Sequence, residues 1–217
     1  MKKTVIFDLD GTLINSLEDL AGATNYALQK HGFATHPVEK YRYFVGNGAN
    51  KLVERALGEH NTPENFAAVK ADFNVYYDAH CFDKTRAYPG IPELLAWLAG
   101  QGIQTAVLSN KPHEFVVQIV ERLFAGHTFS VVLGNRAQFP TKPDPAQANY
   151  AIAQMKAERE SCLFVGDSGV DMLTAKNLHV LGIGVTWGFR EEAELAENGA
   201  DFLAHDAQEL KKIIQNA

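Results

Sequence analysis

The sequence predicts an α/β protein with a doubly wound parallel sheet and a small all-helical cap inserted after the first strand. Short apolar runs alternate with longer amphipathic stretches along most of the 217 residues. Near-continuous apolar strands separated by helices are typical of a parallel sheet that is covered on both faces. Between residues 16 and 80 this alternation stops and only helical patterns occur. Polar and acidic side chains follow several of the expected strands, where open parallel sheets bind their ligands.

Five apolar runs predict the strands of the sheet, and a shorter sixth run is a further candidate. They are Thr4–Leu9, Ile103–Leu108, Phe129–Leu133, Ser161–Val165, Val180–Val185 and the candidate Asp201–Ala204. Amphipathic stretches predict the helices between them, at Ile91–Gly100, Glu114–Phe124, Ala146–Met155, Gly169–Leu178, Glu191–Asn198 and Ala207–Gln215. In the first of these, Leu94, Leu95 and Leu98 recur at helical spacing before the stop signal of Gly100.

The region without strands predicts three helices, each with one apolar face. The faces are Leu17, Leu20, Thr24 and Leu28, then Leu52, Val53, Ala56 and Leu57, then Phe66, Val69, Phe73 and Tyr76. We expect a cap domain at residues 16–81 and a core made of residues 1–15 and 82–217, with a return linker at about 81–89. A helical insert beside a strand end is well placed to act as a lid.

Composition and charge exclude several classes of partner. Twenty lysines and arginines against 26 aspartates and glutamates give a net charge of −6, so we expect neither nucleic acid nor an anionic membrane as a partner. No apolar run reaches the roughly 18 residues of a membrane span. The apolar run after Lys3 ends at Asp8, which is too short for a secretory signal, and Cys81 and Cys162 form no CxxC pair. We therefore expect a reduced, cytoplasmic protein.

The first candidate motif is Asp8-x-Asp10-Gly11-Thr12, at the end of the first predicted strand. Two carboxylates two residues apart can point the same way before the chain turns, and Gly11 permits the turn and the close approach of a ligand. The alternative is an Asx-turn that merely ends a strand.

Two further motifs offer groups that bind phosphate. Ser109 and Asn110 follow a predicted strand, where they either donate to phosphoryl oxygens or cap the next helix. Both roles are compatible, because a helix N-terminus also binds anions. Lys142 stands in a loop that Pro143 and Pro145 stiffen, so its ammonium either points inward at a phosphate or is solvated on the surface.

The fourth motif places Asp167 and Asp171 directly after the apolar run Ser161–Val165. Carboxylates are the ligands of a hard cation such as Mg²⁺, and Asp167 with Asp8 would supply them from two neighbouring strand ends. The alternative is a helix that begins with a capping aspartate and an acidic first turn.

In this order and at one sheet edge, the four motifs resemble the haloacid dehalogenase superfamily of phosphatases. The resemblance covers nearly the whole chain, including the helical cap. It implies Mg²⁺-dependent hydrolysis of a phosphomonoester through an aspartyl-phosphate, with Asp8 as the nucleophile. Asp10 would act as general acid and then as general base, which favours a phosphate ester because an alkoxide needs a proton and a halide does not.

The resemblance also implies the remaining ligand sets. Ser109, Asn110 and Lys142 would bind the phosphoryl group, and Thr12 would bind it or brace its loop. The magnesium ligands would be Asp8, Asp10 (through its backbone carbonyl) and Asp167, with Asp171 acting indirectly or through water.

Within the cap, Gly46, Asn47 and Gly48 form a turn that opens a predicted helix. Its exposed N–H groups would suit a carboxylate or another anion, and the alternative is a plain interhelical turn. This segment and Val185–Arg190 resemble bacterial phosphoglycolate phosphatases. The resemblance therefore implies 2-phosphoglycolate as substrate, with three candidate cationic supports in Arg42, Lys51 and Arg55.

Three other functions stay open at this point. They are a broad phosphatase of small sugar phosphates or pyrophosphate, a phosphomutase of the same fold, and a non-catalytic binding protein. In each catalytic case the partner is a small phosphorylated metabolite, and we expect a monomer or a dimer.

Overall fold

The computed structural model describes residues 3–217, so the expectations that concern residues 1 and 2 lie outside the described residues. Its main sheet has six strands in the order β5-β4-β1-β6-β7-β8. Their bounds are β1 (Thr4–Phe7), β4 (Gln104–Pro112), β5 (Val131–Asn135), β6 (Cys162–Gly166), β7 (Leu181–Val185) and β8 (Phe202–Ala204). Every neighbouring pair in this sheet is parallel, which confirms the predicted fold class.

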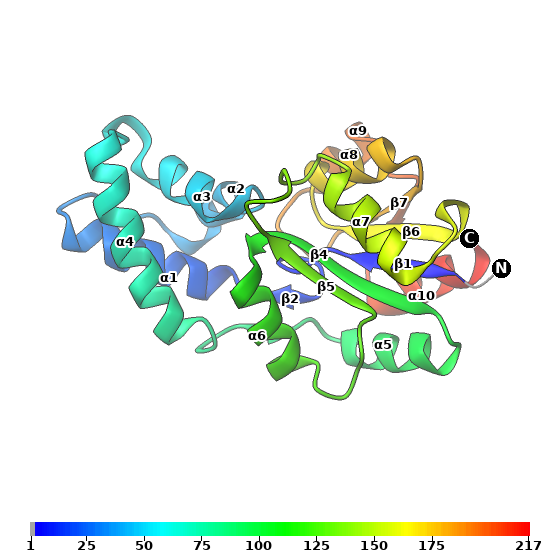
Figure 1. The fold of residues 1–217 in the computed structure, drawn as a ribbon. Coiled ribbons are helices and arrows are strands. Elements are labelled where there is room, and N and C mark those ends of the chain that lie inside the picture. The colour runs from blue at the N-terminus through cyan, green and yellow to red at the C-terminus, as the bar shows by residue number, and fades with distance from the viewer. Residues whose placement is uncertain (1–2) are drawn as a thin grey trace.

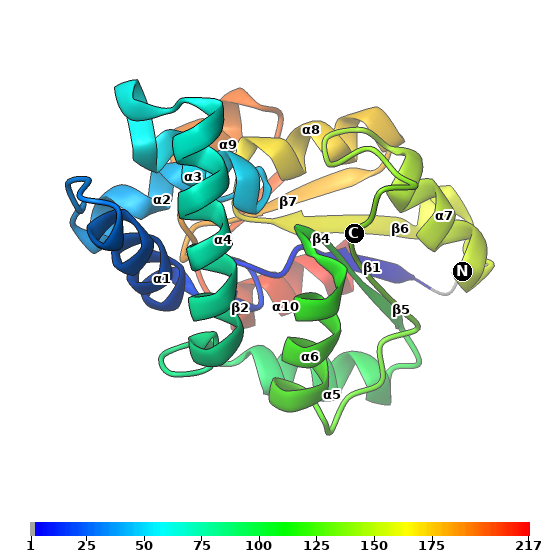
Figure 2. The same ribbon diagram turned by 60° about the vertical axis from the view of Figure 1, so that its left-hand side comes forward.

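Helices cover both faces of the sheet. They are α5 (Ile91–Gly100), α6 (His113–Leu123), α7 (Ala146–Met155), α8 (Gly169–Leu178), α9 (Glu192–Glu197) and α10 (Ala207–Asn216). Figure 2 shows α5, α6 and α10 below the sheet and α7 and α8 above it. In β1, Val5 and Phe7 belong to the apolar cluster that includes α5, α6 and α10, whereas Ile6 belongs to the cluster with α7 and α8. This alternation follows from the period of two in a strand.

Strand β1 ends at Phe7, two residues before the predicted end at Leu9. The amide of Asp8 still donates to Val165 O at 2.9 Å, but the carbonyl of Leu9 then accepts from the amides of Thr12, Leu13 and Ile14. The chain therefore turns at Leu9, although this side chain is fully buried. A buried leucine in a turn continues the apolar pattern of a strand, so the sequence alone does not mark the break.

The cap consists of α1 (Leu17–Lys30), α2 (Tyr41–Phe44), α3 (Gly48–Leu57) and α4 (Pro63–His80), with short 3₁₀ turns at Val38–Lys40 and Gly58–His60. Its helices share an apolar core of their own and lie beside the carboxyl end of the sheet (Figure 1). In α4 the buried side chains are Val69, Phe73 and Tyr77, at intervals of four, whereas Tyr76 is only partly buried. The expected domain boundaries stay a prediction.

A second, two-stranded sheet joins the segments that connect core and cap. Strand β2 (Ile14–Asn15) pairs antiparallel with β3 (Arg86–Ala87). Beside it, the buried carboxylate of Asp19 in α1 accepts from the Thr85 hydroxyl at 2.7 Å, from the Thr85 amide at 2.8 Å and from the Lys84 amide at 3.0 Å. The sequence did not predict these strands, because two residues cannot show an alternating pattern.

Cys81 and Cys162 are free and buried. Burial raises the pKa of the Cys162 thiol to about 11, so it stays protonated and unreactive near neutral pH. None of the described helices combines the length and the apolar character that a bilayer crossing requires.

We predict that Asp19→Ala lowers the free energy of unfolding by about 2–4 kcal/mol, because it leaves the two buried donors of Thr85 and the part-buried amide of Lys84 without an acceptor. Glu18→Ala is the matched control, since Glu18 stands in the same first turn but is exposed. Its effect should stay within about 0.5 kcal/mol. Urea unfolding of the two variants measures the difference, and equal losses would contradict the importance of these hydrogen bonds.

Candidate active site

The predicted site residues meet at the carboxyl end of the sheet, under the cap. A cavity of about 40 Å³ lies between the two parts of the molecule. It is lined by Asp8, Asp10, Leu20, Val45, Gly46, Gly48, Ser109, Asn110 and Lys111. Strands β1 and β4 are hydrogen-bonded neighbours, so the polar residues that follow them face the same space. The cap supplies the opposite wall.

Lys142 is a buried residue of this site and not a solvated surface lysine. Its ammonium donates to Asp8 Oδ1 at 2.8 Å and to Asp171 Oδ1 at 2.7 Å, and the residue is 4% exposed. Burial lowers the pKa of Lys142, but the charges of Asp171 and Asp8 raise this pKa by more, so the lysine stays protonated. Burial raises the pKa of Asp8 to about 7, against the opposing effect of Lys142.

Three buried carboxylates could hold a metal ion. Asp8, Asp167 and Asp171 each offer an oxygen within 4.8 Å of the others. Burial, followed by the charges of Asp171 and Asp8, raises the pKa of Asp167 well above its ordinary value. Lys142 alone does not balance three carboxylates, and their oxygens are the donors that a hard divalent cation prefers. The residues therefore fit Mg²⁺.

Two glycines let the backbone approach Asp167. Gly11 has φ +89°, and a β-carbon there would lie 2.1 Å from Asp167 Oδ2. A β-carbon at Gly188 would lie 2.2 Å from Asp167 Cβ. The amide of Phe189 donates to Asp167 Oδ2 at 2.7 Å, and the Thr12 hydroxyl donates to Asp167 Oδ1 at 3.4 Å. In this structure the side chain of Thr12 thus braces the carboxylate.

Asn110 and Ser109 occupy the end of β4 but make different contacts. The Asn110 side chain accepts from the Lys142 amide at 2.8 Å and donates to Lys142 O at 3.2 Å and to Gly46 O at 3.1 Å. It therefore fastens the lysine loop and the cap turn to the sheet. The Ser109 hydroxyl accepts from the Lys111 amide at 3.2 Å and lines the cavity.

Asp10 lies apart from the three clustered carboxylates and has two partners that the sequence analysis missed. The Ser16 hydroxyl donates to Asp10 Oδ1, and the ammonium of Lys111 lies 3.0 Å from the same oxygen. Lys111 is 6% exposed. Burial lowers the pKa of Lys111, but the charge of Asp10 is the largest of the effects that together raise this pKa by more. One feature of the sequence pointed to Lys111: it directly follows Ser109 and Asn110, at the end of an apolar strand.

The cap turn lies directly over the site. Gly46 and Gly48 line the cavity, whereas the side chain of Asn47 accepts from Arg55 Nη2 at 2.7 Å and does not cap α3. Two arginines tie this region to the core: Arg190 Nη2 donates to Val45 O, and Arg42 Nη2 donates to Gly188 O, both at 2.7 Å. These bonds join the cap to the core.

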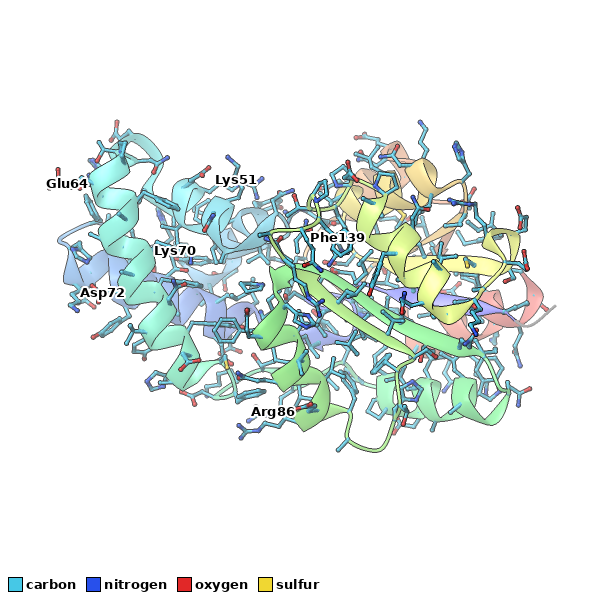
Figure 3. All side chains as sticks on the ribbon, viewed as in Figure 1. Lys51, Glu64, Lys70, Asp72, Arg86 and Phe139 are labelled. Atoms are coloured by element: carbon cyan, nitrogen blue, oxygen red, sulfur yellow. The ribbon has the colours of Figure 1, made fainter. Side chains whose placement is uncertain are left out.

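The three candidate cationic supports have other partners. Arg42 donates to the core carbonyl of Gly188, and Arg55 donates to Phe44 O at 2.9 Å. Lys51 is exposed, pairs with Glu54 at 2.5 Å and lies on the outer side of the cap (Figure 3). In this structure Lys51 is therefore a solvated surface residue.

Comparison with known proteins defines the class to which this site belongs. The model of the haloacid dehalogenase-like hydrolase family matches residues 5–185. Because the match spans most of the chain, the protein belongs to this family. The resemblance inferred from the four motifs is thereby confirmed.

Individual relatives show which hydrolases of this family the chain is similar to. A phosphoglycolate phosphatase of Mannheimia succiniciproducens is 35% identical over 219 residues, which cover 98% of each chain. Phosphoglycolate phosphatase 1 of Pseudomonas aeruginosa is 34% identical over 216 residues, which cover 97% of this chain and 79% of its own. A crystal structure from Lactobacillus delbrueckii subsp. bulgaricus, assigned to the phosphoglycolate phosphatases, has a TM-score of 0.94 at 34% identity and covers 99% of both chains. The protein is a phosphatase, similar to those that bear this name.

We predict that Gly11→Ala lowers the free energy of unfolding by about 2–5 kcal/mol, because the positive φ and the contact with Asp167 both oppose a β-carbon. The control is Gly32→Ala, where φ is +76° and no atom lies within 4 Å of the added carbon. That variant has only the backbone strain, about 1–2 kcal/mol. Urea unfolding compares the two, and a loss at Gly11 no larger than the loss at Gly32 would contradict the close approach.

Proposed function

We propose that the protein hydrolyses a small phosphomonoester, 2-phosphoglycolate, to glycolate and phosphate in a Mg²⁺-dependent reaction. The observation that carries the proposal is a buried Asp8 that contacts Lys142, with Asp10 lining the same cavity as Asp8. Mg²⁺, when bound by Asp8, Asp167, Asp171 and the backbone carbonyl of Asp10, would supply positive charge that offsets repulsion between carboxylate and phosphate.

In the first step, a carboxylate oxygen of Asp8 attacks the phosphorus atom and the bond from phosphorus to the ester oxygen breaks. Asp10 donates a proton to the departing alkoxide, so glycolate leaves and an aspartyl-phosphate remains on Asp8. Lys142 and Ser109 hold the phosphoryl oxygens, while Thr12 and Asn110 keep the surrounding loops in place.

In the second step, Asp10 takes a proton from a water molecule that attacks the phosphorus atom. The bond between phosphorus and the Asp8 oxygen breaks, which releases inorganic phosphate and restores the carboxylate. The closed cap limits the access of other water and of larger acceptors during this step.

The size of the cavity and the cap turn support a small substrate with a second anionic group. About 40 Å³ is room for few atoms beyond the phosphoryl group, which disfavours a hexose phosphate. The N–H groups that open α3 at Gly48 have no side-chain acceptor from Asn47, so a carboxylate could accept from them. Relatives named phosphoglycolate phosphatases point to the same substrate. We place the reaction in the cytoplasm and expect a monomer or a dimer.

We predict that phosphate release with Mg²⁺ is fastest for 2-phosphoglycolate in a panel that includes glucose 6-phosphate, glucose 1-phosphate and pyrophosphate. Chelation by EDTA should abolish release, and added Mg²⁺ should restore it. Similar rates across the panel would contradict the glycolate substrate and favour a broad phosphatase. An isomerised sugar phosphate without phosphate release would favour a phosphomutase.

Asp8→Asn should lower phosphate release by about 10³-fold or more, because the amide cannot form the aspartyl-phosphate. Asp83→Asn makes the same change at an exposed carboxylate and should leave the rate within about two-fold. Both variants should unfold at temperatures close to that of the wild type. Retained turnover in Asp8→Asn would exclude Asp8 as the nucleophile.

Mg²⁺ alone should stabilise the folded protein, by about 2.7 kcal/mol at 100 times its dissociation constant. Asp167→Asn should reduce this stabilisation, because it removes a carboxylate from the buried cluster. Glu64→Gln removes the same charge on the outer end of the cap (Figure 3) and should keep the full effect. Thermal unfolding with and without Mg²⁺ measures it, and equal shifts in both variants would place the ion elsewhere.

A further inference from the structure

Lys111 is a buried charge in the cavity that the proposed mechanism does not use. Its ammonium lies 3.0 Å from Asp10 Oδ1 and 3.3 Å from Asp10 Oδ2, so it contacts both oxygens of one carboxylate. It comes from the end of β4, and Asp10 comes from the turn after the neighbouring strand β1. A buried ammonium requires a partner, and this geometry gives it the proposed acid and base.

Asp10 has a second partner in Ser16, so two side chains hold its carboxylate. Ser16 occupies the residue before α1, where a serine ordinarily accepts from the amides of the first helical turn. In this structure its side chain makes no such capping bond, and its hydroxyl donates to Asp10 Oδ1. The Ser16 hydroxyl thus binds the Asp10 carboxylate instead of capping the first turn of α1.

We propose that Lys111 is a positioning residue for Asp10, which it holds with Ser16 in the place required for proton transfer, and that Tyr77 of the cap keeps Lys111 there. This inference rests on the proposed role of Asp10. The lysine touches neither the phosphorus atom nor the ester oxygen in this scheme, so its effect passes through Asp10 alone.

The cap takes part through one aromatic ring. The ammonium of Lys111 lies 4.9 Å from the centre of the Tyr77 ring, and Tyr77 is 2% exposed in α4. The Tyr77 hydroxyl has no hydrogen-bond partner among residues 3–217, and the contact of the ring with the ammonium is a cation–π interaction. The ring also stacks on Phe73, with centres 5.5 Å apart, which fixes its orientation. Movement of the cap away from the core would therefore remove the Tyr77 ring from its contact with Lys111.

This role has a kinetic signature that a general structural role lacks. An alkyl phosphate needs a proton on its leaving group, whereas p-nitrophenolate leaves without one. Because kcat/KM depends only on steps up to formation of the aspartyl-phosphate, a misplaced Asp10 should lower it for alkyl esters and spare p-nitrophenyl phosphate.

The test compares Lys111→Met and Lys111→Arg on ethyl phosphate, 2-phosphoglycolate and p-nitrophenyl phosphate. For Lys111→Met we expect kcat/KM to fall about 10- to 100-fold on both alkyl esters and less than about three-fold on the aryl ester. Lys111→Arg keeps the charge and should recover part of the loss. Lys40→Met, which removes an exposed lysine of the cap, is the control and should change nothing.

Ser16→Ala should show the same selective loss on the alkyl esters, since it removes the other contact to Asp10. In the double variant with Lys111→Met, kcat/KM should fall by less than the product of the two single losses, because both side chains act through one carboxylate.

Tyr77→Phe should behave as the wild type. Tyr77→Leu, which lacks the ring, should show the same loss as Lys111→Met in weaker form.

Three outcomes would overturn the inference. Equal losses on alkyl and aryl esters would show that Lys111 acts on phosphoryl transfer or on folding. A loss confined to 2-phosphoglycolate, with ethyl phosphate spared, would make Lys111 a ligand of the substrate carboxylate. A crystal structure of Lys111→Met with Asp10 unmoved would also exclude the positioning role.

That crystal structure separates this inference from the proposed function, because it needs no substrate. If the wild type hydrolysed none of the three esters, the proposed function would fail. The position of Asp10 in the variant would still show whether Lys111 holds it.

Discussion

The concentration of negative charge at one edge of the sheet is the constraint on which the rest of the structure depends. Asp8, Asp167 and Asp171 are buried together, and Lys142 contacts two of them. Bringing three carboxylates out of water is unfavourable unless cations and hydrogen bonds compensate. The glycines around Asp167 allow backbone atoms to reach it, and the prolines of the lysine loop limit how far Lys142 can move. The same excess of negative charge makes this edge suitable for a divalent cation.

Three hydrogen bonds between cap and core use backbone carbonyls as acceptors. Arg190 and Asn110 donate from the core to Val45 and Gly46, and Arg42 donates from the cap to Gly188. Each of these carbonyls lies in or beside a segment that borders the site. The contacts that join the cap to the core therefore lie beside the segments that form the walls of the cavity.

The sequence predicted the parts of the molecule whose signal is local. Apolar runs identified five strands of the main sheet and offered the sixth as a candidate, and carboxylates near the ends of two of them, at Asp8 and Asp167, indicated the candidate site. It did not predict β2 and β3, which are too short for periodicity. Nor did it predict the partners of Asp10, because Ser16 looks like an ordinary helix cap and Lys111 like an ordinary lysine. Their importance comes from contacts between segments up to 101 residues apart.

The pairing of β2 with β3 places both crossings between core and cap side by side, at Ile14–Asn15 and Arg86–Ala87. A segment whose two ends are neighbours can be lengthened, shortened or exchanged without changing the register of the main sheet, which is the geometry that tolerates domain insertion. The three clustered carboxylates and most of the cap thus lie in separable segments of the chain. Replacement of the segment between these strands would present a different lid to an unchanged carboxylate cluster.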